Sequence, residues 1–273
     1  MQTEKYDCKP TLTDQQVLDF CRYGFIILEG VVNNTVNQRV SKYLDTRNSE
    51  EPVDILEEEW FVDAVIKNSE AAGAVRSLLG KEFLLPRVIS SHQVHCPAPA
   101  QPWHPDAGSI FTHRLDCLQV FYYPLGATKE MGPTELLPGS HLTRARNAFL
   151  GRLKSMKSAV LTNSPPGSIV ITVYSILHRR TASSATGVRN NLKYTYWRTS
   201  DPQRDWVIDP KFNFSWSKNV FPPLSVDAAN MFAWLCGENW KHIGGPSWPT
   251  FTAGVYDHDQ IGLPENLRSF PEE

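Results

Sequence analysis

Residues 165–198 read PPGSIVITVYSILHRRTASSATGVRNNLKYTYWR and contain two strand signals. The turn Pro165-Pro166-Gly167 is followed by a continuous apolar run, Ser168 to Tyr174, which predicts a buried strand. A second run of large and β-forming residues, Leu192 to Trp197, predicts another strand. His178 lies directly after the first strand, and Arg189 lies just before the second. We expect these two polar residues to lie at the ends of neighbouring strands.

Outward from this stretch, more short strands are separated by turns rich in proline and glycine. Residues 87–95 are β-rich, and Cys117 to Tyr123 (CLQVFYY) predicts a strand. Such a series indicates a β-sandwich or barrel. The first 86 residues are instead mainly helical, around one early strand at 25–28. Helices are expected after Thr13, from Asn33 or Asn34, and over 63–79.

The length of 273 residues suits one large domain. We expect a single domain over 1–273, with a helical support (1–86), a β core that carries the site (87–200) and an irregular segment rich in tryptophan and proline (201–273). That last segment could form a lid over the core or simply pack against its outer face.

Composition and charge exclude several classes of function. The formal net charge of -2 gives no basic footprint for nucleic acid. The five cysteines are scattered and never form a CxxC pair, which argues against disulfides and thiolate zinc sites. No apolar run is long enough to span a membrane, and the N-terminus is too polar for a signal peptide. We therefore expect a cytoplasmic protein with no membrane or nucleic-acid partner, while the oligomeric state is not readable.

His104-Pro105-Asp106 is the motif that carries chemistry, together with His178. An HxD pair on an extended segment places both side chains on one side, because side chains alternate with a period of two. A second imidazole, from His178, would complete a face of two histidines and one carboxylate. This face leaves open positions on the metal and is typical of non-haem iron(II) oxygenases. HxD alone occurs readily by chance in a chain with eight histidines, so the hypothesis depends on the residues falling together around strands.

Arg189 extends this pattern toward a cosubstrate. A guanidinium is planar and can make two parallel charge-assisted hydrogen bonds to a carboxylate. It would therefore suit the far carboxylate of 2-oxoglutarate, whose other end would chelate iron(II) before dioxygen binds. The expected cofactors are Fe(II), 2-oxoglutarate and O2.

The sequence also resembles the phytanoyl-CoA dioxygenase family of iron(II)/2-oxoglutarate oxygenases. The resemblance covers roughly Leu12 to Ser200 and is carried by five segments in order: LTDQQVLDFCRYGFIILEGVV (12–32), HCPAPAQPWHPDAG (95–108), MGPTELLPGSH (131–141), PPGSIVITVYSILHRR (165–180) and GVRNNLKYTYWR (187–198). It implies a mainly β fold with flanking α-helices around a double-stranded β-helix, the jelly-roll or cupin-like core. It also implies that His104, Asp106 and His178 bind iron and that Arg189 binds 2-oxoglutarate.

The same resemblance suggests weaker cosubstrate candidates. His95 takes the place of a lysine that many members have there, Arg180 replaces a small hydroxyl residue, and Thr134 lies near the family's cosubstrate pocket. Among substrate contacts, Gln93 could line the pocket because it shares a strand face with His95. Tyr122 and Tyr196 lie on predicted strands, where aromatic residues are usually core and only one or two should reach substrate.

The expected reaction is oxidation, most simply hydroxylation, of a small organic molecule with release of succinate and CO2. Desaturation, epoxidation or cyclisation of a natural-product intermediate by the same iron chemistry stays open. Two other classes also stay open: a cupin-like isomerase or lyase with another metal, and a non-catalytic metal-binding protein on the same fold. With no peroxisomal signal and no basic patch for a CoA, we expect a free small molecule rather than an acyl-CoA.

Overall fold

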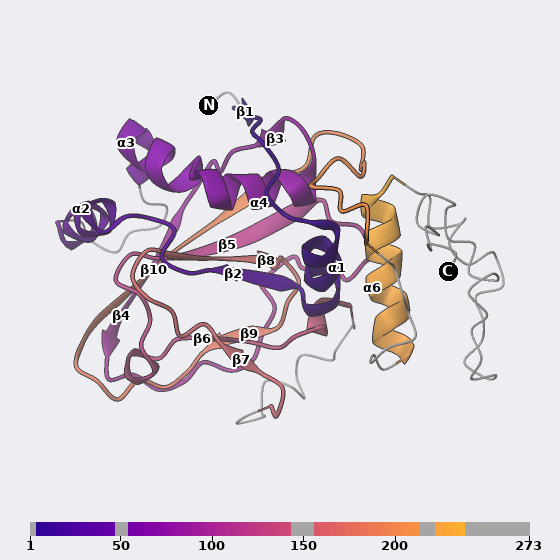
Figure 1. Ribbon diagram of the computed structural model, residues 1–273. Helices are drawn as coiled ribbons and strands as arrows, with labels where there is room; N and C mark the ends of the chain where they lie inside the picture. The colour runs from indigo at the N-terminus through magenta and orange to yellow at the C-terminus, as the bar shows by residue number, and fades with distance from the viewer. Residues whose placement is uncertain (1–3, 47–53, 143–155, 213–221, 238–273) are drawn as a thin grey trace.

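The computed structural model describes residues 4–46, 54–142, 156–212 and 222–237. It contains mainly antiparallel β-structure with helices on one side, which confirms the predicted fold class (Figure 1). The strands are β1 (Lys5–Tyr6), β2 (Phe25–Leu28), β3 (Phe83–Leu84), β4 (Ser90–Cys96), β5 (Cys117–Tyr123), β6 (Thr134–Leu136), β7 (Val160–Leu161), β8 (Ser168–Val173), β9 (His178–Arg180) and β10 (Gly187–Trp197). The helices are α1 (Asp14–Tyr23), α2 (Asn34–Asp45), η1 (Asp54–Glu57), α3 (Glu59–Phe61), η2 (Val62–Ile66), α4 (Ser69–Leu79), η3 (Lys129–Met131), η4 (Ser140–Leu142) and α6 (Pro222–Leu235).

Two sheets form the β core. The larger has seven strands in the order β1-β3-β10-β5-β8-β2, with β4 also paired to β10, and the smaller has the order β7-β6-β9. All the strand pairs within them are antiparallel. Figure 1 shows α4 along one face of the large sheet and the small sheet on its other side. The space between the two sheets is therefore the natural place for a site.

Alternation along β5 separates two hydrophobic clusters. Val120 and Tyr122 belong to the larger cluster, which also contains the buried faces of α1 and α4. Phe121 and Tyr123 belong to a smaller cluster with Leu136 of the small sheet. Successive side chains point to opposite faces of a strand, so β5 faces the helices with one set and the small sheet with the other.

The local signals near the N-terminus are confirmed. Thr13 caps α1 and forms the predicted capping box with Gln16. Asn33 caps α2. Gly24 ends α1 at φ 83°, where a Cβ would also lie 2.3 Å from His141 Nδ1, so only glycine fits.

Three expectations about the elements were wrong. The helix predicted over 63–79 is two helices, η2 and α4, because Asn68 accepts the backbone N–H groups of Glu70 and Ala71 and starts a new helix. Arg189 lies inside β10 rather than before a strand, since β10 begins at Gly187. The segment after 200 is not wholly irregular, because it contains α6, which packs against α1.

The lid remains a prediction. Trp206 donates its indole N–H to the buried carboxylate of Asp14 at 2.8 Å, which fixes this part of the segment against α1. Trp216, Trp240 and Trp248 lie outside the described residues. The division into a single domain with three parts is likewise a prediction.

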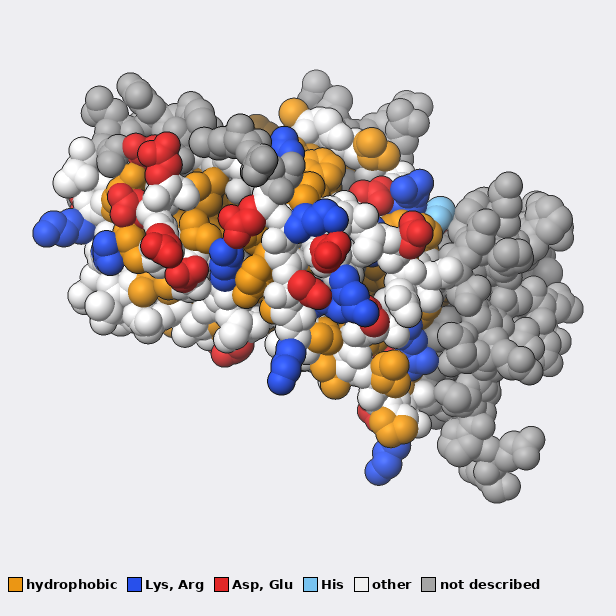
Figure 2. All heavy atoms as spheres, turned by 90° about the horizontal axis from the view of Figure 1, so that it is seen from above, with side chains coloured by type: hydrophobic (Ala, Val, Ile, Leu, Met, Phe, Trp, Pro, Cys, Tyr) orange, Lys and Arg blue, Asp and Glu red, His pale blue; other side chains and the backbone are white. Residues whose placement is uncertain are grey.

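The surface seen from the helix side carries mixed charge. Figure 2 shows acidic and basic side chains interspersed on this face, with hydrophobic side chains between them. Within the described ranges, no helix has the length and apolar character needed to cross a membrane.

His141 in η4 is a structural histidine. It is fully buried, and its Nε2–H donates to the Cys21 carbonyl at 3.0 Å. Burial lowers the pKa of His141 to about 4, although the hydrogen bond to the carbonyl opposes this. Burial also lowers the pKa of His178 to about 4.

The lowered pKa values of His141 and His178 predict that the protein without bound metal loses stability in acid. Between about pH 6.5 and 4 the unfolded chain binds protons that the folded chain excludes, so stability falls as pH falls, by about 1.4 kcal/mol per pH unit for each group. Urea unfolding of the metal-free protein over this window measures the slope. A His141→Gln variant should show a shallower slope, and an unchanged slope would contradict the role of His141.

Candidate metal and cosubstrate site

His104, Asp106 and His178 converge between the two sheets. One potential ligand atom from each residue lies within 4.8 Å of the others. The backbones of His104 and His178 exchange two hydrogen bonds, of 3.1 and 2.9 Å, which join the HxD segment to β9. The rings of the two histidines are 4.7 Å apart. A segment and a strand far apart in the sequence are thus fixed side by side, with three donor groups at one point.

The hydrogen bonds of the two imidazoles leave one nitrogen of each for a metal. His104 Nδ1 lies 2.8 Å from the Pro102 carbonyl, and His178 Nδ1 lies 3.0 Å from the Ile176 carbonyl. Carbonyl groups only accept, so each Nδ1 carries the proton and each Nε2 has a lone pair. Metal-binding histidines usually have this kind of outer partner.

Asp106 is held as an anion. Burial raises the pKa of its carboxyl group, but the positive charge of Lys193, with hydrogen bonds from Lys193 and Gln119, lowers it below its ordinary value. Lys193 Nζ and Gln119 Nε2 both contact Oδ2. Oδ1 faces His178 Nε2 at 3.7 Å. Because the lowered pKa of His178 keeps that ring neutral, this contact is two ligands facing one position rather than an ion pair. Two neutral imidazoles and one carboxylate fit a divalent metal such as Fe(II).

A small cavity of about 70 Å³ adjoins the three residues and is rich in positive charge. It is lined by His92, Val94, Gln101, His104, Asp106, Phe121, Thr134, His178, Arg180, Arg189, Asn191 and Lys193. Among the described residues of this lining, Asp106 is the one acidic residue, against the three cationic side chains of Arg180, Arg189 and Lys193. The lining therefore favours an anion.

Arg189 is fixed at the back of this cavity. Its Nη2 donates to Thr134 Oγ1 at 3.0 Å, and its guanidinium lies over the Tyr123 ring at 5.6 Å. Tyr123 in turn donates its hydroxyl to Thr134 at 2.8 Å. The Nε atoms of Arg180 and Arg189 are buried with no hydrogen-bond partner among the described residues. Buried donors of this kind are costly unless a ligand accepts from them, so the two arginines suit a ligand with acceptor oxygens, such as a carboxylate.

The structure brings some of the sequence-predicted residues together and leaves others out. His104, Asp106, His178, Arg189, Arg180 and Thr134 all meet at this cavity. His95 and Gln93 do not, because β4 turns its alternate residues, His92 and Val94, inward. His95 is exposed instead. The expected roles for Gln93 and His95 are corrected accordingly.

Tyr122 and Tyr196 are also corrected, because both are buried on the helix side of the large sheet. The Tyr122 hydroxyl donates to Asn37 Oδ1 at 2.6 Å, and the Tyr196 hydroxyl donates to the Ile66 carbonyl at 2.7 Å. Their hydroxyl groups thus join the sheet to the helices and do not reach the site.

Sequence reasoning missed Gln119 and Lys193, the two partners of Asp106. Lys193 follows Arg189 by four residues on β10, and Gln119 precedes Phe121 by two on β5. The period-two alternation of a strand could have placed both on the face that carries Arg189 and Phe121.

The contribution of the Gln119 contact with Asp106 to metal binding can be tested directly. Replacing Gln119 with leucine removes a donor from Asp106, and the loss of such an outer partner weakens metal binding by roughly 10–100-fold. Titration of the metal-free protein with Mn(II), followed by electron paramagnetic resonance of the free ion, measures this affinity. Gln93→Leu, on the outward face of β4, is the matched control and should bind like the wild type. Wild-type affinity in Gln119→Leu would show that the contact has no role in metal binding.

Comparison with known proteins gives a family and a fold. The family model described as phytanoyl-CoA dioxygenase (PhyH) matches residues 20–189, more than half of the chain. Sequence comparison with curated proteins gives no match.

Several solved structures share the fold. HygX from Streptomyces hygroscopicus, with nickel and 2-oxoglutarate bound, is similar over 69% of this chain and 88% of its own, with 14% identity and a TM-score of 0.59. The non-haem α-ketoglutarate-dependent epimerase SnoN from nogalamycin biosynthesis is similar over 68% of this chain and 82% of its own, with 15% identity and a TM-score of 0.54. AviO1 from Streptomyces viridochromogenes Tue57 is similar over 68% of this chain and 95% of its own, with 18% identity and a TM-score of 0.53.

Proposed function

Because the chain belongs to the phytanoyl-CoA dioxygenase family, and is therefore a non-haem Fe(II)/2-oxoglutarate-dependent oxygenase, we propose that it hydroxylates a free small organic molecule at the site between its two sheets. His104, Asp106 and His178 would hold the iron, and Arg189 would hold the far carboxylate of 2-oxoglutarate. The observation that carries this assignment is the convergence of the three ligand atoms within 4.8 Å.

Each residue of the site has a distinct task in this proposal. When bound, iron with 2-oxoglutarate and dioxygen supplies the oxidising chemistry and yields succinate and CO2. Gln119 and Lys193 hold Oδ2 of Asp106 and so present its other oxygen to the metal position. Thr134 accepts from Arg189 and orients the guanidinium. Arg180 would add a second positive charge beside the dianion.

Burial strengthens this arrangement. Arg189 is 4% exposed, and charge-assisted hydrogen bonds are stronger where water is excluded. Burial lowers the pKa of Arg189 from its ordinary value, which shows how far the group is removed from solvent. An anion that pairs with it would therefore be bound tightly and in a fixed direction, with its other end toward His104 and His178.

An anaerobic titration tests the proposed function. Fe(II) and 2-oxoglutarate added together to the metal-free protein should produce a visible charge-transfer band that neither produces alone. The absence of any band would favour a non-catalytic metal-binding protein or another metal enzyme on this fold.

A second experiment separates the possible reaction outcomes. Candidate substrates are screened for succinate release, and the product of any hit is weighed by mass spectrometry. Hydroxylation and epoxidation each add one oxygen atom, desaturation or oxidative ring closure removes two hydrogen atoms, and epimerisation leaves the mass unchanged. Solved structures of this fold include both an epimerase, SnoN, and a monooxygenase, ThoJ, so product mass is measured first, and nuclear magnetic resonance of the product then distinguishes a hydroxyl group from an epoxide.

A further inference from the structure

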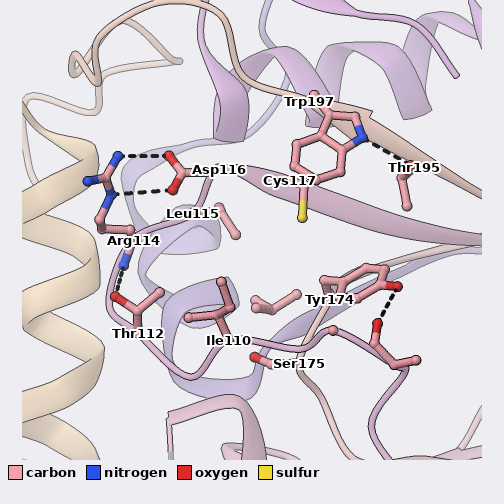
Figure 3. A pocket seen from close by; sticks show the side chains of 13 residues that line it. Ile110, Thr112, Arg114, Leu115, Asp116, Cys117, Tyr174, Ser175, Thr195 and Trp197 are labelled. Carbon is pink, nitrogen blue, oxygen red and sulfur yellow. Dashed lines mark hydrogen bonds and ion pairs between the residues drawn. The ribbon is translucent and has the colours of Figure 1, made fainter.

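A second and much larger cavity has a volume of about 730 Å³. Figure 3 shows the side chains that line it. It is lined by Ala107, Gly108, Ile110, Thr112, Arg114, Leu115, Asp116, Cys117, Val173, Tyr174, Ser175, Thr195 and Trp197. Its volume is within the range of about 300–1,000 Å³ that is usual for small-molecule sites. The small cationic cavity, in contrast, has only about 70 Å³.

The large cavity begins at the backbone that follows Asp106. Ala107 and Gly108 are the next two residues, and the Tyr174 hydroxyl donates to the Ala107 carbonyl at 3.1 Å. Ser109 Oγ donates to the Asp106 carbonyl at 2.7 Å, which fixes the start of this wall. One wall of the cavity is therefore attached directly to a candidate metal ligand.

The strands of the large sheet make the same connection. Lys193 and Gln119 contact Asp106. Two residues further along the same strand faces, Thr195 on β10 and Cys117 on β5 line the large cavity. Thr195 is also the register partner of Gln119. Lys193 and Gln119 thus lie between the two cavities, and the larger one begins directly beyond these two partners of Asp106.

The lining of the large cavity is mostly apolar and carries no net charge. Among the described residues of the lining, Arg114 and Asp116 are the charged ones, and they pair with each other at 3.3 Å. Burial raises the pKa of the Cys117 thiol to about 11, as does the nearby Asp116, so the thiol is neutral. The small cavity suits a dianion, whereas this one has no unpaired charge to offer.

Two large apolar side chains of this lining are exposed to solvent. Ile110 is 76% exposed and Trp197 is 48% exposed. Figure 3 shows Trp197 and Cys117 on one side of the space, and Ile110 and Tyr174 on the other. Exposed apolar surface that lines a hollow is typical of a ligand site. Flat rings on two sides favour a ligand that is itself cyclic.

We infer that the large cavity binds the primary substrate, and that this substrate is a neutral, largely apolar, ring-containing molecule. This inference rests on the proposed function. The oxidised carbon of the substrate would point toward Asp106, past Thr195 and Tyr174. Its few polar groups would meet hydroxyl groups such as that of Thr195, which already accepts from the Trp197 indole at 3.2 Å. An acyl-CoA would not fit this inference, because the lining offers no surplus cation for its phosphates.

A pair of fluorescent probes tests the inference on the full chain loaded with Mn(II) and 2-oxoglutarate. N-phenyl-1-naphthylamine is neutral, and 8-anilino-1-naphthalenesulfonate has the same rings with one negative charge. We expect saturable binding of one equivalent of the neutral probe, with the anionic probe at least about tenfold weaker. Tighter binding of the anionic probe would overturn the inference.

Matched variants locate the binding. Ile110→Asp places a carboxylate on the apolar lining and should weaken binding of the neutral probe by about tenfold or more, because the bound apolar probe would displace water from the charge without pairing with it. Ile208 is another exposed isoleucine, 55% exposed and outside the lining, so Ile208→Asp should bind the probe like the wild type. Equal affinity in Ile110→Asp and Ile208→Asp would contradict the inference.

Paramagnetic broadening tests whether the probe binds beside the metal. Proton resonances of the bound neutral probe should broaden with Mn(II) in the protein and not with Zn(II). Absence of this difference would mean that the occupied cavity is not beside the metal, which overturns the inference.

The iron and 2-oxoglutarate charge-transfer band distinguishes this inference from the proposed function. Ile110→Asp should keep the band, since Ile110 does not line the small cavity. If Ile110→Asp keeps the band and also binds the neutral probe with wild-type affinity, the result would count against the inference alone. A band that is absent even from the wild-type protein would count against the proposed function.

Discussion

Replacing Asp106 with alanine should abolish substrate-dependent succinate formation. The variant keeps both imidazoles but loses the one carboxylate that the described part of the chain contributes to the lining, and with it the negative charge that balances a divalent metal. Loss of an outer partner alone costs roughly 10–100-fold in metal affinity or activity, so loss of the ligand itself should cost more than about 100-fold. Lys193 and Gln119 would also lose their acceptor, leaving the partly buried cation of Lys193 without compensation.

Two controls make the Asp106 result specific. Asp106→Glu keeps the charge at a shifted position and should retain more activity than Asp106→Ala. Asp209→Ala removes an exposed carboxylate whose Oδ1 accepts from the Lys211 backbone, and it should behave like the wild type. Succinate is measured by chromatography after incubation with an identified substrate. Full turnover by Asp106→Ala would show that the ligand assignment is wrong.

Arg189→Ala should have the second largest effect. It should weaken the binding of 2-oxoglutarate rather than the binding of the metal. Hydrogen bonds to charged groups contribute about 1.5–3 kcal/mol each, so losing two of them should weaken 2-oxoglutarate binding by at least about 100-fold. Anaerobic titration of the Fe(II)-loaded variant with 2-oxoglutarate measures the affinity through the charge-transfer band. Mn(II) affinity should stay close to that of the wild type.

Arg189→Lys separates charge from shape. Lysine keeps the positive charge but cannot make two parallel bonds to one carboxylate, so its affinity for 2-oxoglutarate should lie between those of the wild type and Arg189→Ala. The rate at saturating 2-oxoglutarate should recover more than the rate at low concentration. An unchanged affinity in Arg189→Ala would place the cosubstrate elsewhere.

Much of the site could be predicted because its residues lie on extended backbone. His104 and Asp106 are two residues apart, so alternation puts them on one side of the chain, and the bridge to His178 completes the cluster. The strand at 117–123 was predicted with its exact bounds, since its large apolar residues lie between turns.

For β4, the sequence could not predict which set of alternate side chains faces the small cavity. The sequence SHQVHC has polar residues on both faces, so nothing in it distinguishes an inward His92 from an inward His95. Pairing with β10 decides, because Arg189 and Asn191 lie opposite Val94 and His92. The result is a shift of one residue, which exchanges the two faces.

α6 was missed for a different reason. Pro222 and Pro223 begin the segment, and proline signals usually indicate loops, although the first turn of a helix tolerates proline. Its described residues from Ala228 onward are nearly all buried, so the helix has no polar face to give the usual periodicity.

A crystal structure grown anaerobically with Fe(II) and 2-oxoglutarate, with data collected across the iron absorption edge, tests the central claim most directly. The account predicts one anomalous peak within bonding distance of His104 Nε2, an Asp106 carboxylate oxygen and His178 Nε2. It also predicts one carboxylate of 2-oxoglutarate on the Arg189 guanidinium. An iron peak that contacts none of these three side chains, or 2-oxoglutarate bound away from Arg189, would contradict it.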